Sequence, residues 1–179
     1  AVTDLRAQPS EVFLMTDAST KKYASVRTTI PVQASCELLR HTHKRGSWSR
    51  LLTPSQRWLR EHSLLEPEDE LPGAATPFDS TLWESVVPAL PFEFSVVLPV
   101  EKREHINVTE LRAWALADHE AAIVDPDTRP IIGTDSQVVL ACIAKGRSAS
   151  PQLNCVLKMM LPTLLGGNLY SRGFWIPSA

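Results

Sequence analysis

Two short apolar runs, each followed by an acid, organise the hydrophobic pattern of this chain. Residues 11–19 hold four consecutive apolar side chains before Asp17, and the β-branched residues 131–132 lead into Asp135. Uninterrupted apolar runs are typical of strands that are covered on both faces. The pattern therefore predicts two buried strands, each carrying an acid near its carboxyl end.

Other segments show the periods of strands and helices. We predict further strands where β-forming residues alternate or cluster, over residues 21–29, 92–99 and 169–176. Apolar residues at helical spacing predict helices over residues 53–62, 81–87, 105–117, 136–146 and 150–166. Strands that alternate with helices in this way indicate an α/β domain.

The segment from residue 31 to residue 90 departs from this pattern. It contains six prolines and an acidic run, although 53–62 and 81–87 within it have helical character. Because compact domains rarely carry so long an irregular stretch, we expect a surface insertion in a single domain spanning residues 1–179. Its tryptophans, interleaved with arginines, suit either stacking on nucleic-acid bases or anchoring the segment to the core; they are Trp48, Trp58 and Trp83.

Composition and charge narrow the function classes. The chain has 179 residues, 44% of them hydrophobic, and a net charge of only −2. The charge is uneven: the part after Asp135 contains no acid but has the cations Lys145, Arg147, Lys158 and Arg172. A second basic cluster contains Arg40, His41, His43, Lys44, Arg45, Arg50, Arg57 and Arg60. Both a polyanionic partner and ordinary solvated faces produce such asymmetry.

No membrane or export signal is apparent in the sequence. No stretch approaches the ~20 apolar residues needed to span a bilayer, and the N-terminus is not a signal peptide. We therefore expect an intracellular protein, in the cytoplasm or the nucleus, with no membrane partner.

Three acids are placed where an α/β fold can bring them together. Asp17 and Asp135 follow predicted strands, and Glu110 lies near the start of the 105–117 helix. Crowded carboxylates repel one another unless a cation separates them, and paired hard divalent ions suit phosphodiester cleavage. Structural alternatives exist: Glu110 is three residues after Asn107, as in a capping box, and Asp135 can serve the helix that follows it.

Several sequence motifs resemble one family. The runs His-Ile-Asn-Val-Thr-Glu-Leu-Arg-Ala (105–113), Thr-Asp-Ser-Gln-Val-Val-Leu (134–140) and Trp-Ile-Pro-Ser-Ala (175–179) are similar to the ribonuclease H domain of retroelement reverse transcriptases. Lys-Gly-Arg-Ser (145–148), followed by Leu-Asn (153–154), extends the resemblance. The similarity covers about residues 11–21 and 92–179.

The resemblance implies a fold and an activity. The fold is a ribonuclease H-like mixed sheet of five strands flanked by helices, with the first three strands antiparallel and the last two parallel to the first. The activity is that of a metal-dependent endonuclease that hydrolyses the RNA strand of RNA–DNA hybrids. Two Mg²⁺ ions are expected, and Mn²⁺ can substitute. The protein would belong to a retrotransposon polyprotein and have the reverse transcriptase polymerase domain as a partner.

The resemblance also assigns residues. Asp17, Glu110 and Asp135 match the first three catalytic and metal-binding acids of the family. The expected nucleic-acid-binding residues are Ser136, Gln137, Lys145, Arg147, Ser148 and Asn154.

Two departures from the family pattern bear on activity. Family members continue after the Trp-x-Pro-Ser motif to a fourth acid on a closing helix, whereas this sequence stops at residue 179. The separation of Asp17 from Glu110 is also about twice the usual one, because of the 31–90 segment. We therefore expect a C-terminally truncated fragment with weak or no cleavage. The alternative is a catalytically impaired module that binds nucleic acid or packs against a polymerase domain.

Overall fold

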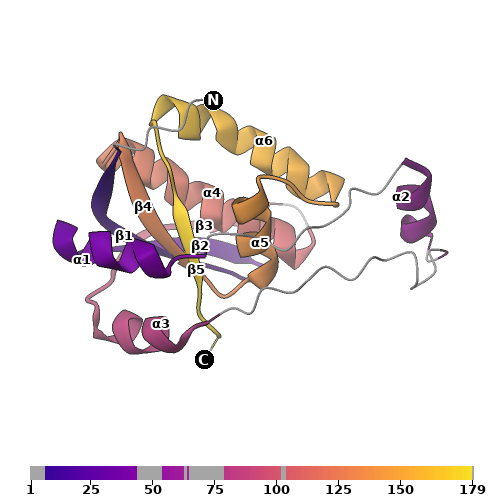
Figure 1. The fold of residues 1–179 in the computed structure, drawn as a ribbon. Coiled ribbons are helices and arrows are strands. Elements are labelled where there is room, and N and C mark those ends of the chain that lie inside the picture. Colours follow the sequence, from indigo (N-terminus) through magenta and orange to yellow (C-terminus); the bar gives the residue numbers. More distant parts are fainter. Residues whose placement is uncertain (1–6, 44–53, 63, 65–78, 102–103, 179) are drawn as a thin grey trace.

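A computed structural model describes residues 7–43, 54–62, 64, 79–101 and 104–178. Five strands form one mixed sheet in the order β3-β2-β1-β4-β5 (Figure 1). The strands are β1 (Gln8–Ala18), β2 (Lys22–Thr29), β3 (Glu93–Pro99), β4 (Thr128–Thr134) and β5 (Arg172–Trp175). Strand β2 is antiparallel to β1 and β3, whereas β4 is parallel to β1 and β5. The predicted α/β fold with a mixed five-stranded sheet is confirmed.

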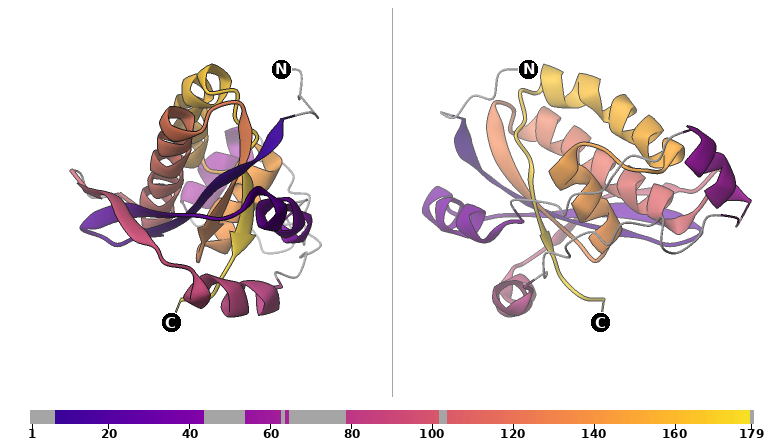
Figure 2. Two further views of the ribbon diagram at one scale, coloured as in Figure 1. Left: turned by 90° about the vertical axis from the view of Figure 1, so that its left-hand side faces the viewer. Right: turned by 45° about the vertical axis from the view of Figure 1, so that its right-hand side comes forward.

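Helices cover both faces of the sheet. On one face lie α4 (Ile106–Val124), α5 (Gln137–Lys145) and α6 (Pro151–Gly166) (Figure 2). The other face carries α1 (Val32–Leu38) and α3 (Thr81–Val86), followed by the short 3-10 turns η1 (Leu39–His41) and η3 (Val87–Ala89). Helix α2 (Pro54–Glu61) lies apart from the sheet (Figure 1).

The two layers explain the uninterrupted apolar run of β1. Val12 and Leu14 belong to the core beneath α4, α5 and α6, whereas Phe13 belongs to the core on the opposite face. Successive strand residues point to opposite faces, so a strand covered on both sides needs apolar residues at every position. The prediction of a doubly buried first strand is thus confirmed.

A close approach of β1, β4 and β5 depends on Gly133. A Cβ atom at this position would lie 2.2 Å from Met15 Sδ and 2.3 Å from Phe174 Cζ. Any larger residue would therefore displace the side chains that fill this core, which has no room to absorb the change.

Helix boundaries agree with the sequence for α5 and disagree for α4. Ser136 caps α5 by accepting a hydrogen bond from the backbone N–H of Val139 at 3.3 Å. Helix α4 begins at Ile106, two residues before the start that a cap at Asn107 would give: His105 is extended, and its Nδ1 accepts from the backbone N–H of Asn107 at 3.2 Å. Asn107 therefore lies inside the helix, and the predicted cap is wrong.

The 31–90 segment contributes to the core where the structure describes it. Trp83 is 1% exposed and stacks on Phe174 with 3.9 Å between ring centroids. Trp58 in α2 is 54% exposed, and Trp48 lies outside the described residues. Trp83 thus anchors its segment to the sheet. Of the two tryptophans of the segment that the structure describes, Trp58 is the one exposed enough to stack on a base. The single domain with a surface insertion stays a prediction.

Candidate functional site

The parallel pairing of β1 and β4 brings two of the predicted acids to one edge of the sheet. Thr16 lies opposite Thr134 in the register, and Asp17 and Asp135 are the residues that follow them. The Thr16 hydroxyl donates to the Gly133 carbonyl at 3.1 Å, which ties the two strand ends together. Carboxyl ends of parallel strands are the usual place for ligands in α/β sheets.

Asp135 is held by the last described residues of the chain. Its Oδ2 accepts a hydrogen bond from the Ser178 hydroxyl at 2.7 Å, and its carbonyl accepts one from the Trp175 indole N–H at 2.9 Å. The Trp-Ile-Pro-Ser run therefore packs against the acid. Sequence reasoning used this run for the family resemblance and missed its contact with Asp135, because the two lie 43 residues apart.

Glu110 carries an unsatisfied oxygen. It lies on α4, which packs on β1 and β2, and its Oε2 is buried without a hydrogen-bond partner among the described residues. Since His105 caps the helix, Glu110 is five residues after the cap and has no capping-box role. A buried carboxylate oxygen without a partner is costly, and a cation bound there would remove the cost. This orphaned atom is what a metal ligand would present.

The complete three-acid cluster is not formed. Within the described part of the chain, no group of three or more His, Cys, Asp and Glu side chains is placed to hold a metal ion. Asp17 is exposed near the carboxyl end of β1, whereas Glu110 is half-buried on α4. The structure therefore brings the strand ends of Asp17 and Asp135 together, and the joint metal site with Glu110 stays a prediction.

Helix α5 connects the acidic edge to the predicted basic surface. It starts after Asp135 and Ser136 and ends at Lys145, with Arg147 just beyond Gly146. At 1.5 Å per residue, the helix separates Lys145 from Asp135 by roughly 14 Å. That separation corresponds to roughly four base steps of a duplex. Cations at this distance would contact backbone phosphates away from a reaction at the acids.

Three of the six predicted nucleic-acid-binding residues already have structural roles. The Ser136 hydroxyl caps α5. The Asn154 side chain accepts from the backbone N–H of Ser148 at 2.8 Å and donates to the Ser148 carbonyl at 2.6 Å. The Ser148 hydroxyl accepts from the backbone N–H of Ser150 at 3.1 Å. These bonds shape the loop that presents Arg147. Gln137 is exposed at the start of α5.

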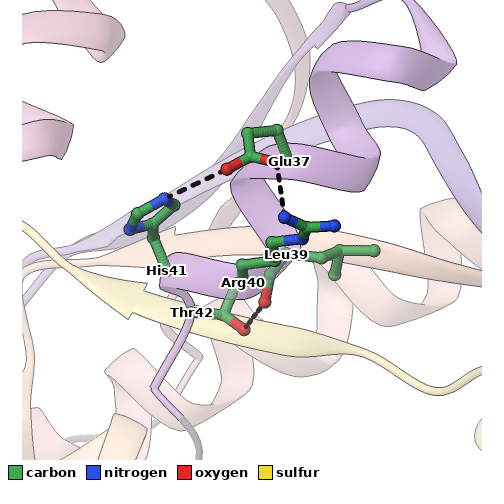
Figure 3. Close-up of polar contacts among 5 residues, drawn as sticks. All are labelled: Glu37, Leu39, Arg40, His41 and Thr42. Atoms are coloured by element: carbon green, nitrogen blue, oxygen red, sulfur yellow. Dashed lines mark hydrogen bonds and ion pairs between the residues drawn. The ribbon is translucent and has the colours of Figure 1, made fainter.

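The second basic cluster is partly neutralised where it is described. Arg40 Nη1 lies 3.3 Å from Glu37 Oε2, and His41 Nε2 lies 3.7 Å from Glu37 Oε1 (Figure 3). The Thr42 hydroxyl donates to the Leu39 carbonyl at 2.8 Å and closes the turn. The members between α1 and α2 lie outside the described residues: Lys44, Arg45 and Arg50. Glu37 therefore reduces the positive charge at this end of α1.

Comparison of the sequence with known protein families gives no match, and neither curated proteins nor solved structures give one. No described helix combines the length and apolar character needed to cross a membrane.

Proposed function

We propose that this chain is a ribonuclease H-like, metal-dependent endonuclease module that hydrolyses the RNA strand of RNA–DNA hybrids within a retroelement reverse transcriptase polyprotein. One observation carries the proposal: Asp17 and Asp135 follow paired positions on adjacent parallel strands, while the neighbouring helix α4 buries an unpartnered Glu110 oxygen. The strand order, with three antiparallel strands and two parallel additions, supports the same assignment. The reaction itself is proposed from the sequence motifs at 105–113, 134–140 and 175–179, which resemble the ribonuclease H family.

The three acids share one role in the proposed reaction. Asp17, Glu110 and Asp135 would hold the metal, for which carboxylate oxygens are suitable hard ligands. When bound, Mg²⁺ supplies Lewis acidity to an attacking water and to the leaving 3′ oxygen. The Ser178 hydroxyl fixes the orientation of the Asp135 carboxylate. Glu110 Oε2 already lies in a water-poor position, where its attraction for a cation is strongest.

Substrate binding would rest on phosphate contacts. Lys145 and Arg147 bind the nucleic-acid backbone without reading its sequence, which suits an enzyme that acts on hybrids of any sequence. Gln137, exposed at the N-terminus of α5, is placed between these cations and the acids. The polymerase domain of the parent polyprotein would deliver the hybrid.

Cleavage of a labelled RNA–DNA hybrid with each metal tests the proposal. We expect weak or no cleavage with Mg²⁺ and a partial rescue with Mn²⁺, because no group of three ligands is placed to hold a metal ion among the described residues and Mn²⁺ tolerates poorer geometry. Adding the Asn-x-x-Asp segment of the family should raise the rate. Asp135→Asn should abolish cleavage in both forms, whereas the same change at exposed Asp127 should leave the rate within a factor of about two.

The second candidate is a catalytically impaired module that binds nucleic acid or packs against a polymerase domain. It is favoured by the lack of a three-ligand metal group in the described residues and by the Ser178 bond to Asp135. Hybrid binding by the extended chain without cleavage under either metal would select this alternative and refute the nuclease.

A further inference from the structure

Helix α2 carries a tryptophan that does not serve either core of the molecule. None of the described side chains of α2 belongs to the two hydrophobic clusters on the faces of the sheet, and Figure 1 shows the helix away from the sheet. Trp58 is 54% exposed, whereas Trp83 and Trp114 are almost completely buried. Trp58 therefore does not anchor its segment to the described core, and its large aromatic ring is open to a partner.

The ring of His62 holds the Trp58 indole in a stacked pair. The two residues are four apart on the same helical face, and their ring centroids lie 4.1 Å apart with 26° between the planes. His62 Nδ1 lies 2.8 Å from the Trp58 carbonyl oxygen, and the backbone N–H of His62 donates to the same oxygen at 3.2 Å. Because a carbonyl only accepts, Nδ1 carries the proton in this bond, which fixes the imidazole against the indole.

The stacked pair is ordered before any ligand arrives. More than half of the Trp58 surface stays exposed although the imidazole covers part of the indole. A ring that is already fixed loses little rotamer freedom on binding, so more of the contact energy appears as affinity. Such a surface suits a flat aromatic ligand, because a further ring can extend the stack.

The charge of the helix favours a polyanion as the source of that ring. Helix α2 contains two arginines and one acid, and three further cations precede it in the sequence within residues 44–50. The acidic run 66–70 that follows lies outside the described residues. Nucleic acids present flat rings next to phosphates, and a single strand leaves its bases free to stack on a protein, whereas a duplex keeps them paired inside. A single strand therefore fits α2 better than a duplex does.

We propose that the Trp58–His62 pair is a stacking platform for an unpaired base of single-stranded nucleic acid. The base lies on the exposed part of the Trp58 indole, and the positive charge of α2 attracts the phosphates beside it. Every base has a flat face, so the platform binds without base preference. The site needs neither the metal ligands nor the hybrid-binding cations Lys145 and Arg147, and it serves a catalytic chain and a non-catalytic one equally.

Fluorescence anisotropy with two labelled strands of equal length tests this proposal. One probe is a short oligothymidylate, and the other is an abasic strand that keeps the phosphates but has no bases. We expect the unaltered chain to bind the oligothymidylate roughly tenfold more tightly, because stacking on an aromatic side chain is lost with the abasic strand. Trp58→Ala should remove most of this difference and leave the affinity for the abasic strand unchanged.

Further variants separate stacking from simple apolar contact. Trp58→Phe should keep most of the preference for the oligothymidylate, whereas Trp58→Leu should lose it as Trp58→Ala does. Leu64→Ala, which shortens a neighbouring apolar side chain that is 60% exposed, should have no effect. Binding of an RNA–DNA hybrid should be the same in all four variants, so this proposal and the nuclease assignment fail separately.

Three results would overturn the platform. Equal affinity of the unaltered chain for the two strands, or no binding of either, would show that no base stacks on Trp58 and would leave it to a protein contact or to solvent. Equal affinities of Trp58→Phe and Trp58→Leu would show an apolar contact without stacking. If Trp58→Ala does not fold, the side chain anchors the core instead, and the comparison of the two strands on the unaltered chain checks that conclusion.

Discussion

Asp118 is the residue whose ionisation should govern how stability depends on pH. Its pKa is raised from 3.8 to about 7 because burial disfavours the charged form. A raised pKa means that the folded state binds the proton more tightly, so the stabilisation is present below pH 3.8 and is lost as pH rises towards 7. At about 1.4 kcal/mol per pH unit, the loss is on the order of 4 kcal/mol.

Urea unfolding of the unaltered chain and of Asp118→Asn measures this effect. The difference between their free energies of unfolding cancels the other titrating groups, and it should shift in favour of Asp118→Asn between pH 4 and pH 7.5. A difference that does not change with pH would mean that Asp118 is solvated. No sequence signal marked this group, because an acid in a helix is ordinarily exposed; Asp118 is buried where α4 packs on α6 and where Ser171, just before β5, bonds to it. Asp135, in contrast, was identifiable from the strand before it.

Among the elements, α5 is the one whose boundaries are set by single residues at both ends. Gly146 has φ 65°, a left-handed conformation that other residues adopt at a cost, and a Cβ atom there would meet nothing within 4 Å. Gly146→Ala should therefore lower the free energy of unfolding by about 1 kcal/mol through backbone strain alone. Chemical denaturation measures the change.

Gly166, at the end of α6, provides the matched control. A Cβ atom there also meets nothing within 4 Å, but the residue lies in the helix. Gly166→Ala should raise stability by up to about 1 kcal/mol. Changes of opposite sign in the free energy of unfolding would confirm that backbone conformation decides the effect of each substitution, and changes of the same sign would contradict it.

The helix ends marked by Ser136 and Gly146 were predictable from local chemistry. The cap of α4 was not predictable, because His105 caps the helix and histidine is an uncommon capping residue.

At the scale of the whole molecule, the sheet was predictable and the meeting of its site residues was not. Strand identities follow from local apolar patterns, and the family resemblance implied their directions. The place of Glu110 relative to Asp17 depends on how α4 lies across β1, which no local pattern encodes. Similarly, Trp83 joins Phe13 and Phe174 in one core although irregular sequence surrounds it.

The charge distribution of the whole molecule should control binding to nucleic acid. Replacing Lys145 and Arg147 with alanine removes two phosphate contacts, so the slope of log affinity against log salt should fall by about 2 and affinity should drop equally for all hybrid sequences. Arg40→Ala is the control, because Glu37 already pairs with that cation on the opposite side of the sheet. Filter binding to an RNA–DNA hybrid, duplex DNA and a single strand across a salt series measures both quantities. An unchanged slope in the double variant would place the hybrid on another face, and the basic surface beyond α5 would then be an ordinary solvated one.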